Sequence, residues 1–220
     1  MIGRSAILAA VMFGLCLSVA GQERFVEPVD EAKLDRSFFA FRAKLIAAAE
    51  RRDAKFILDI VDPDIKLSFG GESGIADFKR MWKVNDRSSE FWAEFIPVIK
   101  NGGKFLRSGG KRTSLFLAPY SFEGFPDDLD AFEHSVIFGK NVRLREAPGL
   151  DAKIIALLSY NIVKKGDVAA GGTPKWTPVT TLGGMAGYVS SEYVRSPIDY
   201  RAGFEKKRGR WKMVIFVAGD

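Results

Sequence analysis

The spacing of apolar residues predicts helices in the first part of the chain. Apolar side chains recur every three or four positions, as on one face of an amphipathic helix, at Leu34, Phe38, Phe41, Leu45 and Ala48. A shorter helix is expected next, with Asp53 as its cap and Pro63 at its end, because proline cannot continue a helix. The same spacing returns within residues 75–82 and 91–99. Helices therefore dominate up to about residue 100.

Between and after these helices the pattern changes to the alternation of strands. Ile65, Leu67 and Phe69 alternate with polar residues, which predicts a half-buried strand before a glycine-rich turn at 70–74. Pairs of glycines bracket short strand candidates at 104–107 and 113–118. A stretch rich in proline and aspartate, 119–130, is expected to be a loop.

The remainder of the chain reads as strands. Five short strands are predicted in about sixty residues, which is typical of a small barrel; they cover residues 136–138, 142–145, 154–158, 176–181 and 186–189. Residues 200–217 alternate around a basic turn and predict a hairpin with one apolar face. An isolated hairpin is not stable in water, so this one must pack on another element.

The strand-rich stretch, roughly residues 135–195, resembles a bacterial Src-homology-3 (SH3b) domain. The resemblance lies in the order and spacing of a set of signature residues: Val142, Arg145, Pro148, Ile154, Leu157, Trp176, Val179, Gly187, Tyr188, Val189, Tyr193 and Val194. The chain departs from the family pattern at Tyr160-Asn161, where a glycine is usual. The resemblance implies a small β-barrel that binds cell-wall peptides or proteins.

The flanking residues are similar in their order to a nuclear-transport-factor-2-like domain. The similarity rests on the helix, short helix and strand before residue 69, and on the terminal strand that Gly209, Arg210 and Trp211 introduce. We therefore expect an α+β fold: a helix-rich body over 21–133, an SH3-like barrel over 134–197, and a hairpin over 198–220 that completes the body. Two separate units are the alternative.

The first twenty residues predict a secretory signal peptide. One basic residue, Arg4, precedes an apolar run that ends in Ser18-Val19-Ala20, too short to span a bilayer. Acylation of Cys16, the only cysteine, is the alternative, but Leu15 stands where a small residue is needed. We expect a mature chain that begins at residue 21, without a transmembrane segment, in the periplasm or cell envelope of a bacterium. The full chain has a formal charge of +6, and in that compartment a modest basic surplus indicates solubility rather than nucleic-acid binding.

Motifs for catalysis and metal binding are weak. His134 is the only histidine, no glycine-x-serine-x-glycine motif is present, and a mature chain without cysteine excludes a thiol nucleophile. The acidic run 127–133 before His134 could offer oxygen ligands to a divalent ion, but it lacks the alternation and glycine of a calcium loop. We expect no cofactor, no metal and no enzymatic activity.

The resemblance and the residue types point to a binding surface at the edge of the barrel. Loop-edge positions hold aromatic and polar groups suited to a short peptide, at Arg145, Tyr160, Asn161 and Tyr193. The other signature residues are expected to be mainly structural: Val142, Pro148, Trp176, Val179, Gly187 and Tyr188. The function predicted is an exported, non-enzymatic protein that binds a cell-wall peptide, that is, peptidoglycan, or an envelope protein.

Two alternatives stay open. The α+β body could be an enzyme that the barrel localises, with a pocket lined by Phe69, Trp82, Trp92 and Phe116, although aromatic residues at such spacing are more often plain core. The chain could also be a structural subunit of an envelope complex, which would require a large exposed apolar patch.

Overall fold

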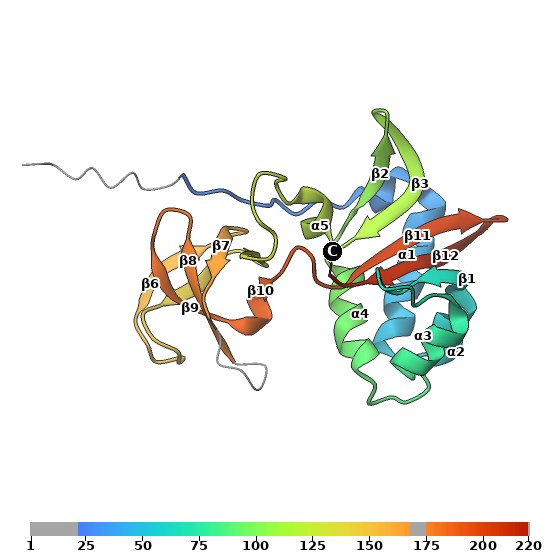
Figure 1. Cartoon of the computed structure of the whole chain (residues 1–220), viewed down its shortest axis with the longest axis horizontal. Coiled ribbons are helices and arrows are strands. Elements are labelled where there is room, and N and C mark those ends of the chain that lie inside the picture. The colour runs from blue at the N-terminus through green and yellow to red at the C-terminus, as the bar shows by residue number, and fades with distance from the viewer. Residues whose placement is uncertain (1–21, 168–174, 220) are drawn as a thin grey trace, which may run out of the picture.

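The computed structural model describes residues 22–167 and 175–219, and they form a mixed α+β structure in two parts (Figure 1). This is the expected fold class. The first part, here called the body, contains the helices and a five-stranded sheet; the second, here called the β-module, is a seven-stranded sheet over residues 134–195. The chain runs through the body, crosses to the β-module and returns. The predicted signal segment lies outside the described residues.

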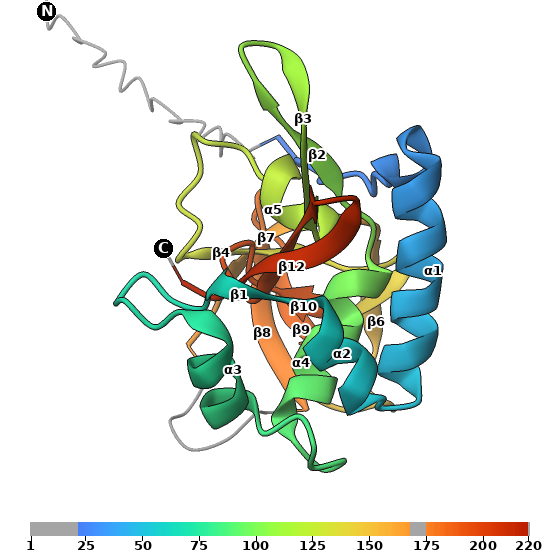
Figure 2. The same cartoon turned by 90° about the vertical axis from the view of Figure 1, so that its right-hand side faces the viewer.

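Capped helices form one layer of the body. In Figure 2, α1 runs along the length of the body beside α2 and α4. Asp35 and Asp53 each accept the N–H three residues ahead at 3.0 Å, which satisfies a donor that a helix start leaves free. The bounds are Arg36–Glu50 for α1, Ala54–Ile60 for α2, Gly74–Trp82 for α3, Glu90–Lys100 for α4 and Tyr120–Gly124 for α5.

The start of the first helix differs from the prediction. Residues Glu31–Leu34 form a separate 3-10 turn, and Asp35 ends that turn before it caps α1. Leu34 consequently lies outside α1 and is 56 % exposed. The predicted apolar face thus begins at Phe38. The short α5 also falls in the stretch expected to be a loop.

The sheet of the body combines strands from both ends of the chain. Its order is β1-β12-β11-β3-β2, in which β1 and β12 are parallel and the other pairs antiparallel. The terminal hairpin therefore occupies the centre of the sheet rather than its rim. The strands are β1 (Val61–Lys66), β2 (Lys104–Ser108), β3 (Lys111–Ala118), β11 (Arg201–Lys207) and β12 (Arg210–Val217).

Strand β1 begins earlier than the alternation around residues 65–69 predicts. It follows α2 directly and contains Pro63, which was expected only to end the helix. Because β1 is an edge strand with a register irregularity, the missing N–H of this proline is tolerated.

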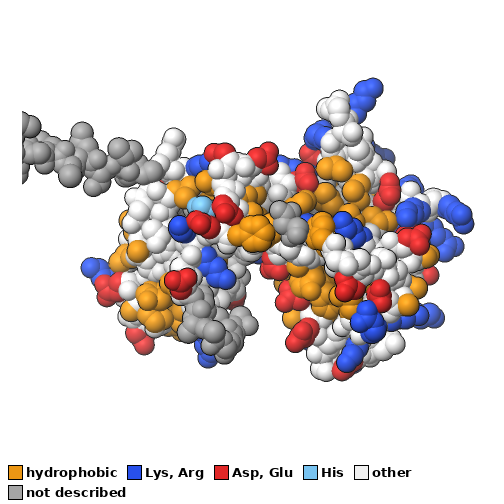
Figure 3. Space-filling view, in the orientation of Figure 1, with side chains coloured by type: hydrophobic (Ala, Val, Ile, Leu, Met, Phe, Trp, Pro, Cys, Tyr) orange, Lys and Arg blue, Asp and Glu red, His pale blue; other side chains and the backbone are white. Residues whose placement is uncertain are grey.

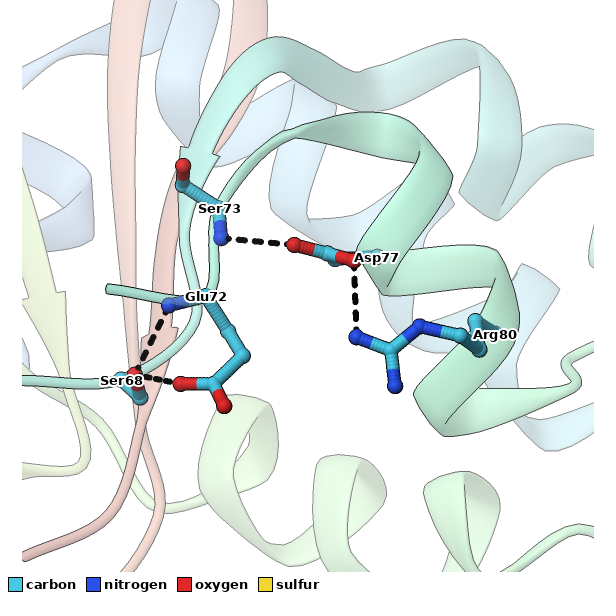
Figure 4. A network of polar contacts seen from close by, with 5 residues as sticks. All are labelled: Ser68, Glu72, Ser73, Asp77 and Arg80. Carbon is cyan, nitrogen blue, oxygen red and sulfur yellow. Dashed lines mark hydrogen bonds and ion pairs between the residues drawn. The ribbon is translucent and has the colours of Figure 1, made fainter. Parts of the chain in front are cut away.

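The turn from β1 to α3 is held by its own polar side chains (Figure 4). The Ser68 hydroxyl accepts the N–H of Glu72 at 3.1 Å and donates to the Glu72 carboxylate, which lowers the pKa of Glu72. The Asp77 carboxylate accepts from Arg80 at 2.8 Å and from the N–H of Ser73 at 3.2 Å, and these bonds lower the pKa of Asp77. The turn is thus internally satisfied and structural.

Aromatic rings dominate the core of the body. The ring centroid of Phe38 lies 4.3–6.0 Å from those of five others: Phe41, Phe105, Phe116, Phe204 and Trp211. Trp82, Trp92 and Phe116, three of the four candidates for the lining of a pocket, are buried in this core. Phe69, the fourth candidate, is 49 % exposed, with the Lys66 ammonium 4.1 Å from its ring centroid. These four residues therefore do not line a common pocket.

The β-module is one antiparallel sheet in the order β10-β4-β7-β8-β9-β5-β6. Three strands have the predicted bounds, β9 is longer by one residue, β4 begins two residues earlier and ends one residue earlier than predicted, and β7 and β10 were not predicted. The strands of the β-module are β4 (His134–Ile137), β5 (Val142–Arg145), β6 (Ile154–Leu158), β7 (Ile162–Lys165), β8 (Trp176–Thr181), β9 (Ala186–Ser190) and β10 (Val194–Arg195).

A segment before the first helix, residues 22–30, here called the strap, joins the two parts. At the β-module, Val26 donates to the Tyr160 carbonyl at 2.9 Å; at the body, Gly103 donates to the Val29 carbonyl at 2.8 Å. The Val26 side chain is buried with Tyr120 of the body, and with residues of β4 and β7. Figure 1 shows the strap crossing from one part to the other. This small apolar cluster fixes how the parts face each other.

Candidate binding cleft between the two parts

A cleft of about 1090 Å³ opens where the β-module faces α4. One wall belongs to α4 and includes Glu94 and Pro97; the opposite wall includes Leu150, Trp176 and Tyr193 of the β-module. Figure 3 shows the cleft as a notch between the two halves of the molecule. A smaller hollow of about 360 Å³ continues it over the β-module, and Leu150, Trp176 and Tyr193 line both. Together they form one continuous groove.

Two of the aromatic side chains of the groove, Trp176 and Tyr193, lie close to the ends of strands. Trp176 opens β8 and pairs with Ser190 of β9. Tyr193 ends the 3-10 turn Ser191–Tyr193, and its carbonyl accepts the N–H of Phe138 at 2.8 Å. The Tyr193 side chain is 39 % exposed and that of Trp176 is half-buried. Anchored aromatic groups with open faces suit the recognition of an extended peptide.

Arg145 lines the smaller hollow of this groove but is buried there, whereas an exposed position at the barrel edge was predicted. Its side chain is only 5 % exposed and donates to the Ala152 carbonyl at 2.5 Å, with its guanidinium 5.9 Å from the Trp176 ring centroid. A bulge between Leu144 and Arg145 breaks the alternation of β5, so that both side chains are buried. Arg145 therefore supports Trp176 instead of offering a free charge to a ligand.

Tyr160 and Asn161 lie away from the groove. Tyr160 has φ +60°, the left-handed backbone that favours glycine, so the chain turns here with a non-glycine residue. Its side chain lines a separate hollow of about 370 Å³ near the strap. Asn161 is 6 % exposed, accepts from the Ser159 N–H at 2.7 Å and donates to Glu23 at 3.1 Å. Asn161 thus holds the strap, and of the four predicted residues only Arg145 and Tyr193 line one groove.

The remaining signature residues divide between core and surface. Val142 and Val179 are buried in the module core. A Cβ on Gly187 would stand 2.6 Å from a backbone oxygen of β5, so this position requires glycine. Tyr188 is half-buried and Pro148 is exposed. Trp176, expected to be mainly structural, is half-buried and also lines the groove.

Glu94 is a functional candidate that the sequence did not indicate. Burial and the negative charge of Asp199 raise the pKa of its carboxyl group. Burial and Glu94 likewise raise the pKa of Tyr200. Arg195, the nearby cation, already donates to the Tyr200 carbonyl at 2.8 Å and pairs with Asp199 at 3.4 Å. In the sequence, Glu94 is one of several polar residues on an amphipathic helix. It becomes a candidate because the β-module lies opposite α4, so that Glu94 lines the cleft.

Groups for catalysis or metal binding do not converge in the described residues. His134 opens β4, where its Nδ1 lies 2.8 Å from the Asp130 carbonyl. Asp128 of the acidic run pairs with Arg24 of the strap at 2.7 Å. Within residues 22–167 and 175–219, no three histidine, cysteine, aspartate or glutamate side chains are grouped so that they could hold a metal ion.

Comparisons of the chain with protein-family models, with curated proteins and with solved structures find no match. Of the helices in the described part of the chain, none has the length and apolar character needed to cross a membrane.

Proposed function

We propose that this protein is an exported, non-enzymatic binding protein that takes a short peptide of the cell wall, or of an envelope protein, in the groove centred on Trp176 and Tyr193. The observation that carries the proposal is the position of these two side chains. Both line the continuous groove, and both belong to a module whose described core is made without them. Large aromatic side chains left outside a core are the usual anchors of binding surfaces.

We further propose that the β-module is an SH3-like barrel. Seven short antiparallel strands around one aliphatic core support this, as does the close contact of Gly187 with β5. The resemblance of residues 135–195 to the SH3b family then supplies the ligand class, a wall peptide or protein, and the periplasm or cell envelope of a bacterium as the compartment.

The proposal is tested by co-sedimentation of the chain from residue 21 with purified peptidoglycan, at low and moderate salt. Binding is expected to persist in salt and to be lost in a Trp176→Ala/Tyr193→Ala variant. Phe132→Ala is the matched control, because Phe132 is 72 % exposed and lies outside the groove. Equal binding by both variants, or no binding by the unaltered chain, would refute the peptidoglycan proposal and leave an envelope protein as the ligand to test.

An enzyme is the second candidate, and Glu94 favours it. A carboxyl group with a raised pKa in a cleft is a typical general acid. Against it, none of the described residues that line the cleft is a histidine or a cysteine. Mass spectrometry of wall fragments after incubation distinguishes the two, since a binding protein leaves them unchanged.

A structural subunit is the third candidate, favoured by β6. This edge strand is entirely apolar, with Ile154 44 % and Leu157 59 % exposed. Exposed apolar edges often mark contacts between proteins. A stable complex on purification that Leu157→Lys disrupts would support this candidate.

A further inference from the structure

The carboxylate of Glu94 is an unpaired charge in the wall of the cleft. In the described part of the chain it makes no hydrogen bond or ion pair, although it is half-buried. The other acids of the cleft are engaged: Glu192 accepts from the Ser190 hydroxyl at 3.1 Å, and Asp199 accepts the N–H of Tyr200 at 2.7 Å. Partly buried carboxylates normally have a partner, because removing a charge from water is costly.

The charges around Glu94 do not supply that partner. Arg195 is held by Asp199 and by a backbone carbonyl, so its charge is already shared. Burial, with the negative charges of Asp199 and Glu90, raises the pKa of the Glu94 carboxyl group, and the positive charge of Arg195 opposes this effect without reversing it. Lys175, the other cation of the cleft, is exposed and belongs to the β-module. The wall formed by α4 is therefore suited to a positive charge brought by a ligand.

The opposite wall, formed by the β-module, is suited to the aliphatic stem of a lysine-like side chain. Trp176 and Tyr193 present aromatic surface to the same cleft as Glu94. Aliphatic stems pack on such rings, and an ammonium group near a ring face is favoured further. An unpaired carboxylate on one wall and aromatic rings on the other thus form a complementary pair of contacts.

We propose that the cleft selects a peptide carrying a primary ammonium side chain, which pairs with Glu94 while its aliphatic stem lies against Tyr193 and Trp176. This inference rests on the proposed peptide-binding function and names the chemistry of its ligand. It also makes the body a part of the binding site, because Glu94 belongs to α4 and not to the β-module.

The probes are three capped tripeptides: acetyl-Gly-Lys-Gly-amide, its norleucine analogue and its acetyl-lysine analogue. Titrations are followed by the indole NMR signal of Trp176 in the unaltered chain, in Glu94→Gln and in Glu146→Gln. We expect the lysine peptide to bind about tenfold more tightly than the norleucine peptide, since the norleucine peptide lacks the charge-assisted contact. Glu94→Gln should abolish this preference, and Glu146→Gln, which alters an exposed acid of the β-module outside the groove, should preserve it.

A second readout reports on the contact itself. The carboxyl carbon signal of Glu94 gives its pKa, which the lysine peptide should lower and the norleucine peptide should not, because only the former brings a positive charge. Lys175→Met is the opposite test: it removes a positive charge from the cleft, so the lysine peptide should bind more tightly than to the unaltered chain.

The outcomes separate the two proposals. Equal binding of the lysine and norleucine peptides, or a preference that survives Glu94→Gln, overturns the ammonium contact and leaves peptide binding in place. Peptidoglycan binding without any response to these peptides also overturns it. Absence of both peptide and peptidoglycan binding overturns the ammonium contact together with the peptidoglycan proposal.

Discussion

The body and the β-module use aromatic residues in opposite ways. In the body, the rings of Phe38, Phe91 and Phe216 lie in the core and contact one another or further rings. The described core of the β-module consists of aliphatic residues: Ile137, Val142, Leu144, Leu158, Val163, Val179 and Val189. Its Trp176 and Tyr193 face the cleft instead. The same residue types thus stabilise one part and form the candidate binding surface of the other.

This difference shows why burial, not residue type, separates structural from functional aromatic side chains. A fully buried ring contributes to stability through removal of apolar area from water and through contacts with neighbouring rings. A half-buried ring at a groove leaves apolar area for a ligand to cover. The comparison predicts that substitutions in the two parts affect different measurements.

The largest loss of stability is expected for Phe38→Ala. Its ring is fully buried among five others, so the variant should lose about 3–5 kcal/mol of unfolding free energy. Denaturant titration followed by fluorescence and by circular dichroism measures it. Phe132→Ala, at an exposed position, should stay within about 0.5 kcal/mol. A loss under about 1 kcal/mol for Phe38→Ala would contradict the role given to the body core.

Arg145→Ala is expected to have an intermediate effect on stability. The buried guanidinium donates to the Ala152 carbonyl, and its removal leaves that acceptor and the Trp176 ring unsupported, at about 1–3 kcal/mol. Arg143→Ala is the matched control, because Arg143 is exposed on the same strand. If the unfolding free energies of both variants equal that of the unaltered chain, Arg145 does not stabilise the fold. The prediction that Arg145 belongs to the binding surface would then be favoured.

Val26→Ala tests the strap that joins the two parts. Removal of two buried carbons should cost about 1.5 kcal/mol, at about 0.8 kcal/mol per methylene group. The variant should also bind peptidoglycan more weakly, since the walls of the cleft belong to different parts. Phe25→Ala, at the neighbouring exposed position, is the control. Unchanged binding in a destabilised Val26→Ala would show that the β-module alone suffices.

The smallest effect is expected for Glu94→Gln, and its sign depends on pH. Because the folded pKa of Glu94 is raised, the folded state holds its proton more strongly, and stability falls as pH rises through that pKa. Glutamine does not ionise, so the variant does not lose stability in this way. At neutral pH its unfolding free energy should exceed that of the unaltered chain by less than about 1 kcal/mol, because the Glu94 carboxylate is partly screened by solvent. Below the ordinary glutamate pKa the two proteins should melt alike. A variant destabilised at neutral pH would indicate an unseen partner for Glu94.

Elements whose pattern lies within a few consecutive residues are predicted well. The helical spacing around Phe38 and the Asp53 cap predict α1 and α2, and the strand pattern around Val142 predicts β5. The predictions are wrong where one irregular backbone conformation, such as a β-bulge or a left-handed residue, interrupts the pattern. The bulge at Leu144 and Arg145 turned an expected surface charge inward, and Tyr160 adopts a left-handed backbone that its residue type does not predict.

The candidate site was only partly predictable. The family pattern indicates Tyr193 as a binding residue and Trp176 as a structural one, and no feature of the sequence indicates Glu94. Glu94 and Trp176 lie 82 positions apart, and only the packing that the strap and the Tyr120 cluster fix makes them line one cleft. Such a site depends on how two parts dock, and no periodicity within either part carries that information.

The central claim is that Trp176 serves binding rather than stability, and one variant tests it directly. Trp176→Ala is to be measured both for unfolding free energy and for binding to purified peptidoglycan. The account predicts a change of less than about 1 kcal/mol in stability, as for a substitution outside the core, together with loss of binding. A loss of about 3 kcal/mol or more with binding retained, as expected for a buried tryptophan, would contradict it.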